Sequence, residues 1–421
     1  MSSCDLYIDQ IKQLVTVKGF SQQAARGASQ QEIGLIEDGA VAIRQGVIIA
    51  AGPKKELERA GWKSGAGRYL NAGGMIALPG FIDPHTHLVF AGSREEEFVA
   101  RLRGEDYLSI LEQGGGILHT VRATRSASAE ELFRAGKKWA LRLSEMGTTT
   151  LEAKSGYGLD FVTELKQLKV IRELNQSLPL ELVPTYLGAH AWPEEYQADH
   201  PGYLQFIIKR VLPEIARLKL AEFCDVFCEK GVFSRQASKL LLEEASKLGL
   251  KPKLHADEIN NLEGAELAAE VGAVSADHLV AVSEKGLKAM AAAGVIAVLL
   301  PGTSFILQKG HYAPARQMIG AGVPVALASD FNPGSSPVGS MALIVSLAVI
   351  KMGLAVEEAI TAVTINAAHA LDRGERLGSI EPGKQADLIL LELDDYRQIP
   401  YYFGFNTVKV VIKKGRLIKG G

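Results

Sequence analysis

The sequence predicts an α/β fold, a closed (β/α)₈ TIM barrel with a small β-sandwich domain formed by both chain termini. Two observations favour it. In the middle of the 421-residue chain, short apolar runs alternate eight times with amphipathic segments, which is typical of a parallel barrel. Gly-rich β-segments occupy both chain ends, and each end alone is too small to bury a good core. Strands from opposite ends are therefore expected to pair.

Three consecutive segments follow from this pattern. Residues 1–75 form the N-terminal part of the β-sandwich, 76–368 form the barrel, and 369–421 form the C-terminal part of the sandwich. A doubly wound sheet is the alternative, but no G-x-G-x-x-G follows the first strand. The connection over 94–127 is long enough to be a functional loop. The expected barrel strands are 75–82, 148–153, 181–187, 222–228, 251–255, 273–279, 295–300 and 323–328, with helices between them such as 129–146, 161–175, 234–248 and 262–271.

Composition excludes several classes of partner. The net charge is −2, from 46 basic and 48 acidic side chains, so neither a nucleic-acid footprint nor a basic stripe for anionic lipid is present. The N-terminus lacks a signal-peptide pattern, and no apolar run reaches membrane-spanning length. Three cysteines, Cys4, Cys224 and Cys228, are too few for a disulfide framework. We expect a cytoplasmic protein without nucleic-acid or membrane partners.

Histidines gather where the predicted barrel strands end. His85 and His87 follow the first strand, and His190, His255 and His278 follow the third, fifth and sixth. A single histidine would more often be a core or surface residue, but five of the nine lie at such ends. In a barrel these ends share one face, where active sites lie.

This arrangement predicts a metal site. Three imidazoles with one carboxylate suit Zn²⁺ or Fe²⁺ and leave a position for water, which ionises near neutral pH when bound to such an ion. Asp330, after the eighth strand, is the candidate acceptor for the proton of that water.

The chain resembles the amidohydrolase superfamily. The resemblance lies in Pro-Gly-Phe-Ile-Asp-Pro-His-Thr-His over 79–87, in the later His255, His278 and Ser329-Asp330, and in the closing segment 378–388. More specific segments resemble the imidazolonepropionase family of histidine degradation. These six segments are 85–94 with Glu97-Phe98, 114–117, 152–158, 187–191, 255–258 and 330–335.

The resemblance implies a cyclic amide hydrolase that opens 4-imidazolone-5-propanoate to N-formimidoyl-L-glutamate. It implies one divalent metal per chain, Zn or Fe, held by His85, His87, His255 and Asp330. His278 would stabilise the oxyanion, and Glu258 would contact the ring nitrogens and relay a proton. Enzymes of this kind are commonly homodimers.

The substrate would be a small molecule with a carboxylate. By the same resemblance, Arg94 would pair with that carboxylate through its planar fork. The other substrate-binding residues would be Tyr157, His190 and Glu258, with Asn332, Gly334 and Ser335 in the loop after the eighth strand. Tyr107, in the long first loop, is a further candidate.

Several alternatives stay open at this point. Arg94 could instead pair with Glu96 or Glu97 on a helix face. A single metal ion is favoured because the fourth strand ends Cys228-Glu-Lys230, without a confident bridging lysine. A barrel deaminase of a cytosine- or guanine-like ring would share most of the site, although Arg94 favours a carboxylated substrate. A non-enzymatic protein that kept this fold should have lost metal ligands, whereas every expected ligand position of this sequence is filled.

Overall fold

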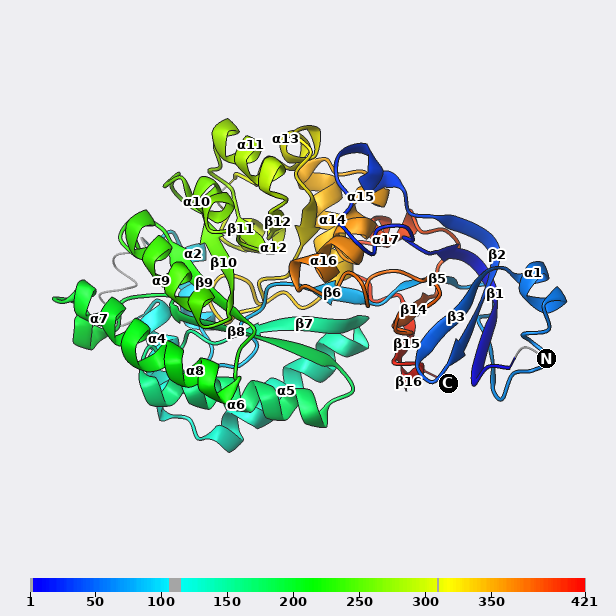
Figure 1. Cartoon of the computed structure of the whole chain (residues 1–421), viewed down its shortest axis with the longest axis horizontal. Coiled ribbons are helices and arrows are strands. Elements are labelled where there is room, and N and C mark those ends of the chain that lie inside the picture. The colour runs from blue at the N-terminus through cyan, green and yellow to red at the C-terminus, as the bar shows by residue number, and fades with distance from the viewer. Residues whose placement is uncertain (1–2, 106–114, 309, 421) are drawn as a thin grey trace.

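The computed structural model of the chain describes residues 3–105, 115–308 and 310–420. A barrel surrounded by helices lies beside a smaller sheet domain, and both chain ends lie on the sheet domain (Figure 1). Among the described residues, no helix is both long and apolar enough to cross a membrane.

Eight parallel strands form a nearly closed barrel, which confirms the predicted (β/α)₈ fold. The hydrogen bonds Asp330 N to His85 O (3.1 Å) and His87 N to Phe331 O (2.9 Å) join the ends of the first and last strands. The strands are neighbours in chain order. They are β6 (Phe81–Asp83), β7 (Thr148–Lys154), β8 (Glu181–Ala189), β9 (Phe223–Cys228), β10 (Lys251–Ala256), β11 (Ser275–His278), β12 (Ile296–Leu299) and β13 (Val325–Leu327).

The apolar run 75–82, expected as one barrel strand, is divided between two sheets. β5 (Ile76–Pro79) pairs with strands of the terminal sheet, and β6 belongs to the barrel. Gly80 lies between them, and its N–H donates to Asp387 O while Phe81 N donates to Gly147 O. A Cβ on Gly80 would lie 2.3 Å from Thr149 Cγ2, so only glycine allows this close passage from one sheet to the other.

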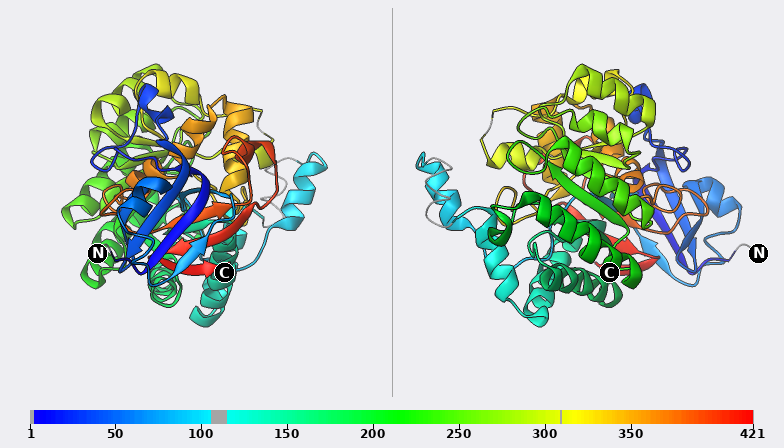
Figure 2. Two further views of the ribbon diagram at one scale, coloured as in Figure 1. Left: turned by 90° about the vertical axis from the view of Figure 1, so that its right-hand side faces the viewer. Right: turned by 60° about the vertical axis from the view of Figure 1, so that its left-hand side comes forward.

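Helices cover the outside of the barrel. Several begin at a side chain that accepts a backbone N–H; Ser128 caps α5 (Ala129–Glu145), and Asp160 caps α6 (Phe161–Ser177). The other helices of the barrel domain are α2 (Glu95–Leu102), α4 (Ile117–Ser126), α7 (His200–Phe206), α8 (Leu212–Leu218), α9 (Arg235–Lys247), α10 (Gly264–Glu270), α11 (Glu284–Ala293), α12 (Pro301–Ile306), α13 (Ala315–Gly320), α14 (Met341–Met352), α15 (Val356–Ala362) and α16 (Ile365–Ala370). Figure 2 shows α2 projecting away from the body of the barrel.

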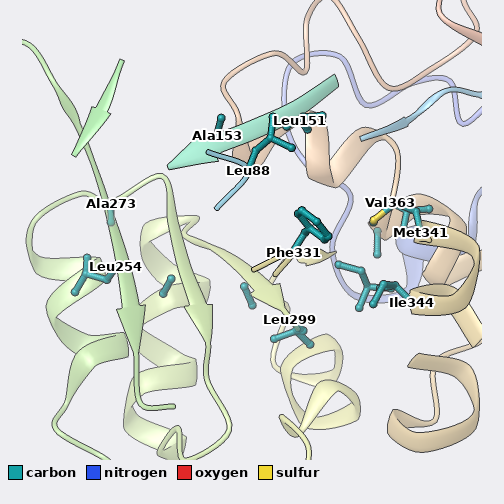
Figure 3. Close-up of a cluster of buried hydrophobic side chains, with 14 of the residues drawn as sticks. Leu88, Leu151, Ala153, Leu254, Ala273, Leu299, Phe331, Met341, Ile344 and Val363 are labelled. Carbon is teal, nitrogen blue, oxygen red and sulfur yellow. The ribbon is translucent and has the colours of Figure 1, made fainter. Parts of the chain in front are cut away.

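Residues on each barrel strand alternate between two environments. Leu151 and Ala153 of β7 and Leu254 of β10 join a large apolar cluster with α14, which supplies Met341 and Ile344 (Figure 3). Glu152, between Leu151 and Ala153, and Lys253, next to Leu254, are also buried, but they contact each other inside the barrel. On β7 and β10, apolar side chains therefore face the helices and polar side chains face inward beneath the site, whereas on other strands, such as β12, the second set is also apolar.

Strands from the two chain ends pair in one domain, as predicted, and they form one mixed eight-stranded sheet. β5 is antiparallel to β14 and parallel to β1, and so connects the C-terminal strands to the N-terminal ones. Figure 2 shows these blue and red strands side by side. The sheet order is β16-β15-β14-β5-β1-β2-β3, with β4 paired to β1. The bounds are β1 (Leu6–Val15), β2 (Leu35–Arg44), β3 (Val47–Pro53), β4 (Tyr69–Asn71), β14 (Leu388–Leu391), β15 (Val408–Lys413) and β16 (Arg416–Lys419), with helices α1 (Lys54–Arg59) and α17 (Gln398–Tyr401).

Candidate active site

The barrel brings the four residues expected as metal ligands into one buried cluster. The ring centroids of His85 and His255 are 4.5 Å apart, and those of His85 and His87 are 5.3 Å apart. Asp330 Oδ1 lies 3.5 Å from both His85 Nε2 and His87 Nε2. His278 joins the cluster, with its ring centroid 5.2 Å from that of His255.

The donor atoms of this cluster fit a divalent metal ion. One possible ligand atom from each of His85, His87 and His255 lies within 4.8 Å of the others. His85 Nε2 and His255 Nε2 are buried without a hydrogen-bond partner. Polar atoms buried in this way are costly, and a bound cation would supply the missing partner. Imidazole nitrogens with a carboxylate are ligands that such a cation accepts.

Two buried aspartates orient the histidines. His85 Nδ1 lies 2.6 Å from Asp277 Oδ2, and His255 Nδ1 lies 3.0 Å from Asp225 Oδ2. Burial, followed by the charge of Lys154, holds the pKa of His85 well below its usual value, so its ring is neutral. An ionised Asp277 accepts from Nδ1 of the neutral ring, which leaves the lone pair of Nε2 facing the cluster. Carboxylates behind metal-binding histidines act in this way.

A buried network of charges lies beneath the cluster, and the sequence interpretation missed it. Lys154 Nζ lies 2.7 Å from Asp225 Oδ2 and 2.8 Å from Glu152 Oε2, and Lys253 Nζ lies 2.8 Å from Glu152 Oε1. All of these side chains are fully buried. Together with Asp277, the network sets three carboxyl groups against two ammonium groups, directly beneath the histidine cluster. The network was missed because lysine is rarely buried. The sequence signal that could have revealed it is the presence of charged residues at inward-facing positions of neighbouring strands.

Asp330 is held in a strained and strongly polar position. Its φ is +53°, and its Oδ2 accepts a hydrogen bond of 2.6 Å from Thr303 Oγ1, a contact that sequence reasoning missed. Burial alone would raise the pKa of Asp330, but His87 and His278 lower it to about 2. The side chain is therefore ionised at neutral pH and can accept a proton or bind a cation.

The two remaining catalytic candidates lie at the edge of the cluster. Glu258 Oε2 is 3.7 Å from His278 Nδ1, and their side chains are 12% and 5% exposed. His278 ends β11 with a φ of +74°, and its Nε2 has no hydrogen-bond partner. The pair could contact the two ends of one polar group that entered the site.

Tyr157 and His190 line another side of the cluster. The His190 ring stacks on His87 at 5.0 Å and 14°, and Tyr157 lies 5.4 Å from His190. His190 Nδ1 lies 3.0 Å from Gly156 O, and burial holds its pKa well below the usual value. A neutral ring that donates from Nδ1 to this carbonyl keeps Nε2 as an acceptor. Gly156 has a φ of +106°, and a Cβ there would lie 2.7 Å from Leu187 O.

The loop after β13 is organised by Asn332. Its Oδ1 accepts hydrogen bonds of 2.8 Å from Gly334 N and from Ser335 N, and its Nδ2 donates to Asp330 O at 2.6 Å. A Cβ on Gly334 would lie 2.0 Å from Arg94 Nη1, so glycine leaves room for this guanidinium. The loop therefore places the expected substrate residues beside one another.

Arg94 is paired with Glu97, which is one of the two partners that the alternative interpretation from sequence named for it. Arg94 Nε and Nη2 donate to the two Glu97 carboxylate oxygens at 2.9 and 2.7 Å. The pair is not solvated, because the side chains are only 12% and 13% exposed. A bound carboxylate would have to contact the Nη1 edge of Arg94 or displace Glu97. Tyr107 lies outside the described residues.

Comparison with known proteins assigns the class. The model of the amidohydrolase family matches residues 103–418. The structure also resembles an adenosine deaminase from Xanthomonas campestris with bound zinc, at a TM-score of 0.74 and 21% identity, covering 100% of this chain and 94% of that one. A 5-methylcytosine deaminase from Klebsiella pneumoniae matches at a TM-score of 0.71 and 17% identity, covering 99% and 98%. At such identities these structures support the fold alone. The chain belongs to the amidohydrolase family.

Within this family, sequence identity narrows the assignment. The imidazolonepropionase of Alkaliphilus metalliredigens is 50% identical over 415 residues, 98% of both chains. Those of Bacteroides fragilis and Shouchella clausii are 51% identical over 406 residues and 49% identical over 417, covering 96% and 99% of this chain and 96% and 93% of theirs. The particular group to which the chain belongs is the imidazolonepropionases.

Proposed function

We propose that the protein hydrolyses 4-imidazolone-5-propanoate to N-formimidoyl-L-glutamate in histidine degradation. The observation that carries the proposal is the identity of 49–51% with imidazolonepropionases over nearly the whole chain. The buried cluster of His85, His87, His255 and Asp330 supports it chemically. Deaminases match only at the level of the fold, so the alternative of a nucleobase deaminase is less well supported.

In the proposed mechanism, one divalent metal ion, zinc or iron, is held by the three histidines and Asp330. When bound, such an ion lowers the pKa of water and polarises a carbonyl. A second group of possible metal ligands, His85, Glu152 and Asp277, lies next to the first. Lys154 and Lys253 already pair with Glu152 there, which supports a single metal ion.

The protein's own groups would move the protons. Water adds to the ring carbonyl carbon, the carbon–nitrogen bond breaks, and the departing nitrogen takes up a proton. Asp330, ionised at neutral pH, accepts the proton of the attacking water, with Thr303 fixing its orientation. His278 would face the developing oxyanion, and Glu258 would relay the proton that Asp330 accepted to the departing ring nitrogen.

Substrate recognition would use the residues that line the cluster and the loop after β13. Arg94 binds the propanoate carboxylate, next to Gly334 and Ser335 in the loop shaped by Asn332. Tyr157 and His190 hold the ring, with His190 Nε2 as a neutral acceptor. Tyr107 is proposed as an additional contact.

A substrate comparison tests this function against its alternative. The purified protein is incubated separately with imidazolonepropanoate, cytosine and guanine, and both loss of the imidazolone absorbance and release of ammonia are followed. Turnover of imidazolonepropanoate alone is expected. Ammonia release from a nucleobase without imidazolone turnover would instead identify a deaminase.

We further propose a cytoplasmic homodimer whose chain divides into the segments 1–75, 76–368 and 369–421, except that 76–79 belong to the terminal sheet. The dimer is supported by exposed apolar side chains, since Tyr401, Phe405 and Ile350 are 76%, 72% and 61% exposed. The compartment is supported by three buried free cysteines. Light scattering of the wild type and of Phe405→Ser tests the dimer, because the substitution should lower the measured mass toward one chain.

A further inference from the structure

We infer that Glu229 is a positioning residue that fixes the loop carrying Glu258. The inference rests on the proposed function, because it assigns to Glu229 the placement of a group that acts in that reaction. Glu229 follows β9 directly, and its side chain is buried. It belongs neither to the histidine cluster nor to the charge network beneath it.

The Glu229 carboxylate is used almost entirely to hold one neighbouring loop. Its Oε2 accepts hydrogen bonds from Ile259 N at 2.9 Å and from Asn260 N at 3.2 Å. Its Oε1 accepts from Asn260 Nδ2 at 2.9 Å and from Lys230 N at 2.8 Å. Within the described parts of the chain, no lysine or arginine pairs with it. Its charge is therefore stabilised by four N–H donors, three of which come from the two residues after Glu258.

A second carboxylate holds the same loop on the other side of Glu258. Asp257 has a φ of +49°, and its side chain accepts hydrogen bonds from Leu262 N, Gly264 N and Ala265 N at 2.9 to 3.1 Å. Its carbonyl oxygen accepts from Ala281 N at 2.8 Å. Asp257 thus anchors the loop to the start of α10 and to the segment after β11. Glu258 is the residue between the two anchors.

The loop has no regular structure of its own over 257–262, so these anchors set where Glu258 lies. Asp257 fixes the peptide group before Glu258, and Glu229 fixes the peptide group after it. The result is the 3.7 Å separation between Glu258 Oε2 and His278 Nδ1. A displacement of about 1 Å at a reacting group can cost roughly 100-fold in rate. Glu229 therefore acts on the reaction through Glu258 and without contact with the substrate.

The test compares Glu229→Gln with a matched control. In Glu229→Gln an amide replaces one oxygen, and an NH₂ group cannot accept the N–H groups that point at it. Glu358→Gln is the control, because Glu358 is also buried and accepts from the backbone N–H of Ala355 and the side-chain amide of Gln31, in addition to pairing with Arg316, away from the site. Amide hydrogen exchange over 257–262, metal content, kcat and KM are measured for both variants.

We expect faster exchange over 257–262 only in Glu229→Gln, with unchanged metal content. Its kcat should fall by about 10- to 100-fold while KM changes less than about threefold. In the double variant, Glu229→Gln with Glu258→Gln, kcat should be less than about threefold lower than in Glu258→Gln alone, because the carboxylate that Glu229 positions is already altered. If Glu229→Gln does not fold, Asn260→Ala removes one of the four bonds and should show a smaller effect with the same dependence on Glu258.

Two results would overturn the inference. One is that the wild type is active and Glu229→Gln has the same kcat, although amide exchange over 257–262 is faster in the variant. The other is a loss of kcat of the same factor whether or not Glu258 is intact. A wild type that does not turn over imidazolonepropanoate is a different result, because it refutes the proposed function itself, while the exchange comparison would still test whether Glu229 holds the loop.

Discussion

His85 Nδ1 lies 2.6 Å from Asp277 Oδ2, and both side chains are completely buried. This contact selects the ring form in which His85 presents Nε2 to the proposed metal. We predict that Asp277→Asn weakens metal binding by about 10- to 100-fold, as loss of such a partner does elsewhere. Competition with a chromogenic chelator measures the affinity. Asp9→Asn, at a buried aspartate of the terminal sheet, is the control and should leave the affinity unchanged; an equal effect of both substitutions would contradict the assigned role.

Asp330 combines the roles of proposed ligand and proton acceptor. Asp330→Ala should lower kcat by about 10³-fold or more while the circular dichroism spectrum stays native. Thr303→Val removes only the 2.6 Å hydrogen bond to Asp330 Oδ2 and should cost about 10-fold. Wild-type turnover by Asp330→Ala would exclude both proposed roles.

Arg94 is predicted to recognise the substrate carboxylate. Arg94→Lys should raise KM by about 10-fold, since a lysine cannot offer the planar fork, with a smaller change in kcat. Arg217 forms a similar bidentate pair with Glu214 three residues earlier, on the surface, and Arg217→Lys is the matched control. Steady-state kinetics of both variants checks this prediction, and equal KM values would show that Arg94 serves only its pair with Glu97.

Glu181 links β8 to the C-terminal segment and should contribute a pH-dependent stability. Burial would raise its pKa, but Arg376, Lys413 and Arg373 hold the pKa at about 2. Because this lies below the unfolded value of about 4.3, the stabilisation is complete above pH 5 and is lost as the pH falls toward 2. Glu181→Gln should cost about 1–3 kcal/mol at pH 7. The difference in Tm from wild type should shrink between pH 5 and 2; a constant difference would contradict the account.

The sequence predicted the parts of the fold that local patterns encode. The strand ends at His85, His255 and His278 were found because apolar runs mark barrel strands and their carboxyl ends share one face. The division of 75–82 was missed, because the run is continuously apolar and only the tight passage of Gly80 past Thr149 reveals the change of sheet. Local periodicity carries no information about which sheet a strand joins.

The supporting residues of the site could not be predicted from the sequence. Lys154, Asp225 and Asp277 lie on three different strands, so their contacts depend on the register of the whole barrel. Likewise, the contact of Glu229 with Ile259 joins loops 30 residues apart. Position along a strand indicates which residues face inward, whereas the distances between them require the folded chain.

The central claim is that the histidine cluster serves a metal-dependent opening of the imidazolone ring. It is tested most directly by following the imidazolone absorbance with wild-type protein, with protein stripped of metal by a chelator, and with stripped protein reloaded with Zn²⁺ or Fe²⁺. The account predicts turnover to N-formimidoyl-L-glutamate by wild type, loss of turnover after stripping, and recovery on reloading with one ion per chain. Full activity of the stripped protein, or no imidazolone turnover by the reloaded protein, would contradict it.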